Sequence, residues 1–187
     1  MTGVGQGAAS ALPPTAEVDM ASKKASHKTG KVPAAGRPHI PGYGISVSRK
    51  GVLPWKWARE RLSKSRQYWI ATTRPEGSPH LMIVWGLWMA DGLYFSTGKN
   101  SRKARNLAEN PRCVMGSENA EQAVIVEGVV EIFDHPEDLK PLFAAYKKKY
   151  KYDISGMGEP FYRLKPRVAF GLIEKTFPST ATRWTFS

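Results

Sequence analysis

The residues of this chain best suited to chemistry lie in the stretch GLYFSTGKNSRKARNLAENPR, at positions 92–112. A short apolar run leads into a turn with Ser and Thr hydroxyls, and a helical pattern begins after Ser101. Arg102, Lys103 and Arg105 fall in the first turn of that helix, where cations oppose the helix dipole. A bound anion would instead meet free N–H groups, hydroxyls and these cations. The stretch therefore fits a phosphate site, and equally a solvated basic helix face.

The rest of the sequence offers no catalytic motif of another kind. No GxSxG, HExxH, CxxC or P-loop pattern occurs, and no GxGxxG fingerprint follows a strand. The four histidines are scattered along the chain, and no metal-binding cluster is expected. If the protein is an enzyme, the difficult chemistry is therefore expected to come from a bound cofactor.

Strand-like segments surround the candidate phosphate site. Helices are expected to begin near Pro54, after Ser101 and after Asp134. Closely spaced strands joined by hairpins favour a small antiparallel barrel over a doubly wound sheet. The expected strands cover residues 68–73, 80–89, 93–95, 112–116, 123–133, 161–165 and 168–174.

Two details of these elements lead to specific expectations. The segment 80–89 is apolar almost throughout, as in a strand buried on both faces, and Gly86 within it indicates a bulge or a close backbone approach. The lysine run 147–149 falls near the C-terminal end of a helix, where cations suit the dipole, so these side chains are expected to be solvated.

Composition sets the broader limits. The chain has 187 residues, with 28 Lys and Arg against 16 Asp and Glu, a net charge of +12. Residues 1–36 are rich in Gly, Ala, Ser, Pro and Lys and are expected to be disordered, which leaves 37–187 as one domain. Nucleic acid is a conceivable partner for such a charge, but no strand alternates aromatic and basic residues, so this class is the least favoured.

Cysteine content and hydropathy indicate where the protein works. The lone Cys113 excludes an intrachain disulfide framework and fits a reducing compartment, with the thiol expected to be buried and inert. No apolar run is long enough to span a bilayer, and none near the start looks like a signal peptide. A cytoplasmic protein is expected.

Three segments together resemble one known family: SPHLMIVWGLW, LYFSTGKNSRKARNLAENPR and AVIVEGVVEIF. From about Trp57 to the C-terminus, the sequence is similar to the pyridoxamine 5′-phosphate oxidase-like superfamily of FMN-binding split-barrel proteins. The resemblance implies a mainly β fold with inserted helices, built on a six-stranded antiparallel split β-barrel. It also implies a homodimer that holds FMN, or a deazaflavin coenzyme, at its interface.

The resemblance also assigns a cofactor site. In that family, the hydroxyls before the helix and the Arg-Lys pair at its start hold the flavin phosphate, and the preceding strand lies beside the ring. The partner chain contributes residues around Gln122 and from the C-terminal region. The cofactor-binding residues that this implies here are Met82, Ile83, Val84, Trp85, Ser96, Thr97, Lys99, Ser101, Arg102, Lys103, Gln122 and Arg183.

Three positions depart from the vitamin-B6 oxidases. Met82, Leu172 and Thr185 stand where those enzymes carry an arginine, a tryptophan and a substrate-contacting histidine. The chain is therefore expected to be a flavin- or deazaflavin-dependent oxidoreductase other than a pyridoxamine phosphate oxidase, passing hydride between the ring and an unidentified small substrate. A non-catalytic flavin or haem carrier or sensor is the alternative of another class. For Tyr68 and His80, packing is favoured over a role as general acid.

Overall fold

The computed structural model of the protein describes residues 32–90, 92–134 and 136–187, without the side chains of 136–138. Its strands are β1 (Ala34–Gly36), β2 (Gln67–Thr73), β3 (Pro79–Met89), β4 (Gly92–Ser96), β5 (Arg112–Ser117), β6 (Gln122–Ile132), β7 (Phe161–Ile173) and β8 (Thr182–Thr185). Its helices are α1 (Trp55–Lys64), α2 (Arg102–Glu109), α3 (Pro136–Tyr150), the 3-10 turn η1 (Glu174–Thr176) and α4 (Phe177–Thr180).

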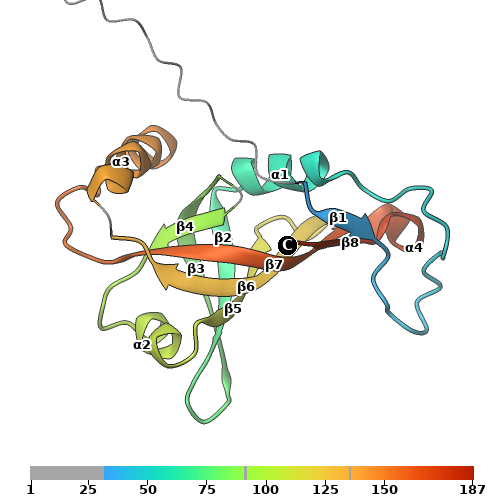
Figure 1. Ribbon diagram of the computed structural model, residues 1–187, viewed down its shortest axis with the longest axis horizontal. Helices are drawn as coiled ribbons and strands as arrows, with labels where there is room; N and C mark the ends of the chain where they lie inside the picture. Colours follow the sequence, from blue (N-terminus) through green and yellow to red (C-terminus); the bar gives the residue numbers. More distant parts are fainter. Residues whose placement is uncertain (1–31, 91, 135) are drawn as a thin grey trace, which may run out of the picture.

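The strands form one antiparallel sheet that closes on itself. The order is β1-β8-β7-β4-β3-β2-β5-β6, and a further pairing of β6 with β7 completes a ring of six strands from β2 to β7. β8 and β1 extend the sheet beyond the ring, along the C-terminal half of β7 (Figure 1). The expected six-stranded antiparallel split barrel is confirmed.

Alternate side chains of the strands fill the barrel, as the period of two along a strand requires. Tyr68 and Ile70 of β2 point inward, and α1 adds Trp55, Ala58 and Leu62 to the same core. α2 contributes Ala104 and Leu107. Trp55, the tryptophan that opens α1, is therefore a core anchor.

A second, smaller core lies outside the barrel, beneath α3. Leu142, Tyr146 and Tyr150 of that helix cover Leu87 of β3 and Tyr94 of β4. In Figure 1, α3 stands apart from the other helices, beyond the end of the sheet where β4 lies. α3 runs from residue 136 past Pro141, so that proline does not delay the start of the helix. This packing leaves α3 and the connection after it beside the outer face of β3.

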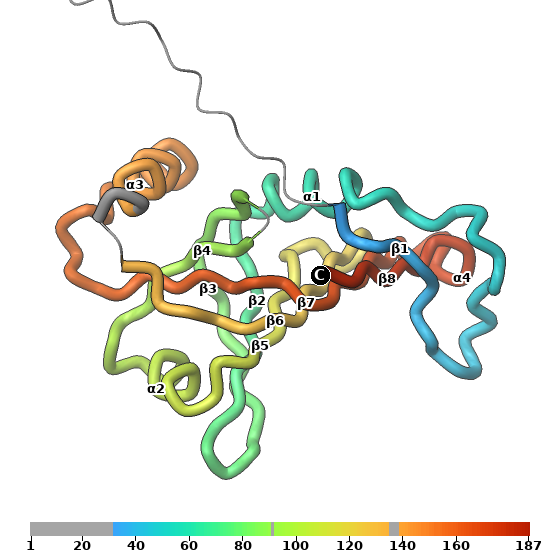
Figure 2. The backbone as a smooth tube through the Cα atoms, in the orientation of Figure 1, coloured from blue at the N-terminus to red at the C-terminus, as the bar shows by residue number. Residues whose placement is uncertain are grey.

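Strand β1 corrects the expected limit of the N-terminal tail. Residues 34–36 pair with β8, and the two ends of the described chain run side by side in Figure 2. The Arg49 guanidinium also donates to the Ala35 carbonyl at 2.8 Å. Disorder was predicted because the segment has little apolar surface, but main-chain pairing needs none. Residues 1–31 of that predicted tail lie outside the described residues.

Strand β7 is continuous, whereas two strands were expected at 161–165 and 168–174. Pro166 lies opposite Gly128, where the pairing with β6 shifts register. A Cβ on Gly128 would lie 2.2 Å from the Lys165 carbonyl oxygen, so glycine permits the irregularity that accommodates the proline. β8 was also not expected from the sequence. In the structure, burial alternates along Arg183, Trp184 and Thr185, as it does in a strand with one face on the core.

Strand β3 is buried differently from the prediction. Gly86 is confirmed as a close approach, since an added Cβ would lie 3.0 Å from the Tyr94 carbonyl oxygen. Burial on both faces holds only for the second half of the strand, because Leu81, Ile83 and Trp85 are 55%, 42% and 38% exposed. Their neighbours on the outer face also include exposed apolar side chains, so the described residues leave this part of the sheet partly uncovered.

Candidate functional site

A cavity of about 290 Å³ lies where β3, β4 and the start of α2 meet the connection that follows α3. Six of its lining residues come from the predicted cofactor site, in three segments of the chain: Ile83, Val84, Trp85, Ser96, Thr97 and Lys103. The other lining residues are Gly98, in the turn after Thr97, and five residues that the sequence did not indicate: Tyr146, Tyr152, Ile154, Met157 and Glu159. The structure therefore brings the strand and the helix start to one place.

The turn between β4 and α2 is shaped by its own hydroxyls. Ser101 is the N-cap of α2, and its side chain accepts a hydrogen bond from the Ala104 N–H at 3.2 Å. The Ser101 and Thr97 hydroxyls lie 3.1 Å apart, and Ser96 donates to the Pro160 carbonyl at 2.9 Å. The first N–H groups of a helix have no intrahelical acceptor, so this turn can present N–H and O–H donors to an anion.

Lys103 is the cation that reaches the cavity. Partial burial lowers the pKa of its amine, and no ion pair found among the described residues involves it. A partly dehydrated ammonium gains most from a charged hydrogen-bond acceptor. Arg102, one residue earlier, is exposed at the same helix start. The site thus has positive charge available for an anion such as a phosphate.

The far wall of the cavity is aromatic and held in place by the end of α3. Trp85 stacks on Tyr150 with ring centroids 4.6 Å apart and planes 5° from parallel. The Tyr150 hydroxyl donates to the Gly86 carbonyl at 2.7 Å. Lys149 donates to the same carbonyl at 2.8 Å and to the Tyr68 hydroxyl at 3.2 Å. These bonds hold the end of α3, and with it the Tyr150 ring on which Trp85 stacks.

Lys149 departs from the expectation that the lysine run 147–149 is solvated. Lys147 and Lys148 are exposed, whereas Lys149 is half-buried, and this burial lowers the pKa of its amine to about 8. Tyr68 is fully buried and donates to the Leu62 carbonyl, which confirms its packing role.

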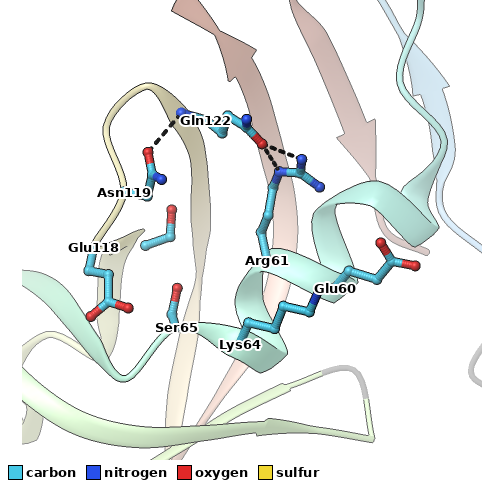
Figure 3. A pocket seen from close by; sticks show the side chains of 8 residues that line it. Glu60, Arg61, Lys64, Ser65, Glu118, Asn119 and Gln122 are labelled. Atoms are coloured by element: carbon cyan, nitrogen blue, oxygen red, sulfur yellow. Dashed lines mark hydrogen bonds between the residues drawn. The ribbon is translucent and has the colours of Figure 1, made fainter.

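Gln122 lies in a different pocket, of about 360 Å³, between α1 and the β5–β6 hairpin (Figure 3). The Arg61 guanidinium lies 3.9 Å from the Trp57 ring centroid and donates through Nε and Nη2 to the Gln122 Oε1. Asn119 accepts from the Gln122 backbone N–H at 3.0 Å. Within one chain, therefore, Gln122 does not reach the cavity.

The other predicted site residues are placed as follows. Arg183 of β8 donates to the Thr185 hydroxyl and does not line the cavity either. Met82 is half exposed on β3, and the Lys99 backbone N–H donates to the Glu159 carboxylate at 2.7 Å. Cys113 is buried, which raises the pKa of its thiol to about 12 and fits the inert role expected of it.

The sequence and the fold of this chain are similar to those of known proteins. The family model described as pyridoxamine 5′-phosphate oxidase matches residues 55–176, from the first residue of α1 to the end of η1. The chain belongs to the pyridoxamine 5′-phosphate oxidase-like family. No curated protein sequence matches it.

Solved structures of this family type share the fold. A conserved hypothetical protein of Mycobacterium tuberculosis is 23% identical, with a TM-score of 0.57 over 65% of this chain and 86% of that one. A structure described as an F420 reductase is 22% identical, with a TM-score of 0.50 over 59% and 94% of the two chains. The haem storage protein HutZ of Vibrio cholerae is 18% identical, with a TM-score of 0.52 over 59% and 87%.

The cavity suits part of a flavin rather than the whole. Its volume is at the lower end of the roughly 300–1,000 Å³ typical of ligand sites. The donors at 96–103 and the free cation suit the phosphate end, while the open apolar face of β3 beyond Ile83 suits a ring. The residues of this family member therefore fit a phosphate-bearing planar cofactor that extends out of the cavity.

The wall from α3 to β7 is what sequence reasoning missed. Tyr152, Met157 and Glu159 lie in a connection without regular secondary structure, so no periodicity marks them. Only the cluster of aromatic residues around position 150 was a usable signal. Among the described residues, no group of His, Cys, Asp and Glu could hold a metal ion, and no helix is long and apolar enough to cross a membrane.

Proposed function

We propose that the protein binds FMN, or the related deazaflavin coenzyme, with its phosphate at the start of α2 and its ring over β3. We further propose that it is an oxidoreductase, passing hydride between that ring and a small substrate. The observation that carries this proposal is the meeting of Trp85, Thr97 and Lys103, from three separate segments, around one cavity. Membership of the family supports it.

The chain's own residues would bind and orient the cofactor, and the redox step would be the chemistry of its ring. Lys103 and Arg102 supply charge to the phosphate. The Thr97 and Ser101 hydroxyls share one hydrogen bond, which leaves one O–H of the pair to donate. Trp85, fixed by its stack on Tyr150, gives the ring a flat apolar surface and keeps water from one side. The opposite side of the ring is left for the substrate.

A homodimer completes the proposal. Exposed apolar side chains lie together on the outer face of three paired strands, with Trp69 opposite Ile83 and with both Leu81 and Val114 opposite Ala71. A contiguous exposed apolar face of this kind indicates an interaction surface. A second copy seated there would cover the ring and could supply Gln122 and Arg183, which lie away from the cavity of their own chain.

The test is a titration of the purified protein with FMN, with the deazaflavin coenzyme and with haemin, followed by absorption and fluorescence. We expect one flavin-type ligand to bind per chain, and its ring to be reduced by a nicotinamide donor and reoxidised by an acceptor. Failure of both flavins to bind would overturn the proposal. Binding without any redox turnover would favour a carrier or sensor instead, and tight binding of haemin alone would favour a haem protein.

A further inference from the structure

The Glu159 carboxylate lies directly on the turn that the proposed function assigns to the cofactor phosphate. Its Oε2 accepts the Lys99 N–H at 2.7 Å, and a Cβ on Gly98 would lie 3.9 Å from its Oε1. Glu159 also lines the cavity together with Thr97 and Lys103. A phosphate at this turn would therefore have a carboxylate as its immediate neighbour.

The position of Glu159 is set by the backbone around it. The Ser96 hydroxyl donates to the carbonyl of Pro160, the next residue, at 2.9 Å. Phe161 then pairs with Ser96 as the first residue of β7. The backbone that follows Glu159 is thus held beside Ser96, and the Lys99 N–H holds the carboxylate against the turn.

We infer that Glu159 sets which phosphate the site accepts, favouring a singly charged phosphodiester over a doubly charged phosphate monoester. The physical reason is Coulomb repulsion between the Glu159 carboxylate and the phosphate, which grows with the charge of the ligand. FMN carries a monoester that is a dianion above pH ~6. A deazaflavin coenzyme joined through a phosphodiester carries one charge at the same atom.

This inference rests on the proposed function and narrows the choice of cofactor within it. A carboxylate that accepts an N–H of the turn takes a donor that a phosphate would otherwise use. The binding affinity of a dianion is lowered for two reasons. The carboxylate repels it more strongly, and it has more need of that N–H donor. For both reasons, the binding affinity of a phosphodiester is lowered less.

The experiment compares wild type with Glu159→Gln at pH 8, using riboflavin, FMN and the deazaflavin coenzyme as ligands. Glutamine keeps an oxygen acceptor for the Lys99 N–H and removes only the charge. With repulsion of about fivefold per unit of phosphate charge, Glu159→Gln should tighten FMN binding roughly 25-fold and the phosphodiester about fivefold. Riboflavin has the same ring and no phosphate, so its affinity should not change.

Two matched variants control the comparison. Glu109→Gln removes the same charge from the far end of α2, about 12 Å away at 1.5 Å per residue, and should leave all three affinities as they are. Glu159→Asp keeps the charge and should keep the preference. Thermal melting of each variant without ligand reports whether the fold is intact.

The outcomes separate the two proposals. If wild type binds a flavin and Glu159→Gln changes FMN and riboflavin alike, or neither, the inference about Glu159 is wrong and the proposed function stands. If no protein binds any of the three ligands, the proposed function fails and the inference fails with it.

Discussion

Two polar hollows of this molecule, the Gln122 pocket and the cavity at the start of α2, differ more in chemistry than in size. The pocket around Gln122 is the larger, at about 360 Å³ against about 290 Å³. Three of its polar side chains are already paired, since Arg61 donates to Gln122 and Glu118 accepts the backbone N–H groups of Arg66 and Gln67. The cavity at the start of α2 has instead a partly buried Lys103 outside any of the ion pairs among described residues.

The comparison teaches that volume is a poor guide to a binding site here. A pocket whose donors and acceptors are paired gains little from a ligand, because each new hydrogen bond replaces an existing one. A half-dehydrated cation beside an aromatic wall gains charge compensation and apolar contact together. The predictions below either strengthen or remove this distinction between the cavity and the Gln122 pocket.

The largest effect is expected from Leu81→Asp, on the apolar face that continues from the cavity. A second copy of the chain on this face would bury the new carboxylate twice, at a cost on the order of 4 kcal/mol per dimer. Light scattering should show monomers. Flavin binding should also be weakened. Val47→Asp is the control, since Val47 is 98% exposed on a loop elsewhere. A dimer that survives Leu81→Asp would place the interface on another face.

Removing the cations at the start of α2 should come next. Arg102→Ala combined with Lys103→Ala should weaken FMN binding by about 3 kcal/mol, since each charged hydrogen bond contributes roughly 1.5–3 and Arg102 is exposed. Fluorescence titration measures the loss. The pair Lys56→Ala and Arg59→Ala removes two exposed charges from α1 and should have little effect. Equal losses in both double variants would mean that only overall charge matters.

Lys149 lies between the two hollows, and its charge should make stability depend on pH. Burial lowers its pKa to about 8, with Glu118 opposing this and Arg66 adding to it. As pH rises, the folded protein therefore releases this proton before the unfolded chain does. The charged Lys149 amine lowers the free energy of unfolding below pH ~8, and this destabilisation is gone above its ordinary pKa near 10.5.

The measurement is urea unfolding of wild type, Lys149→Met and the exposed control Lys148→Met at several pH values. Relative to Lys149→Met, wild type should gain about 1–2 kcal/mol between pH 8 and 10.5, a figure reduced for the half-exposed amine. The Lys148→Met variant should follow wild type. Parallel curves for wild type and Lys149→Met would show that the amine is fully hydrated.

The smallest effect is expected in the Gln122 pocket. If Gln122 serves the cofactor of a partner chain, Gln122→Ala should weaken FMN binding by about 1 kcal/mol, the usual contribution of one neutral hydrogen bond. Lys64→Ala, in the same pocket, should leave binding unchanged. A loss for Lys64→Ala as large as that for the α2 double variant would put the phosphate in this pocket and reverse the comparison.

Prediction from sequence succeeded where the pattern is local. The strand-turn-helix from Gly92 to Glu109 follows from apolar periodicity and a serine at the helix start, and a small antiparallel barrel follows from closely spaced strands joined by hairpins. Both are confirmed, as is the six-stranded split barrel that the family resemblance implied. It failed where a contact joins distant segments. The pairing of residues 34–36 with β8 and the burial of Lys149 depend on partners far away in the chain. Glu159 is a third case, because only the fold places it against Lys99.

The short strand β1 also protects the molecule from aggregation through an open sheet edge. β8 holds the fully buried Trp184, and β1 satisfies the edge of β8 that faces away from β7. Unpaired sheet edges are templates for intermolecular pairing, and proteins commonly cover them with very short strands. Removing residues 1–36 as a dispensable tail would uncover that edge and promote aggregation. A truncation that stops at residue 31 would leave it covered.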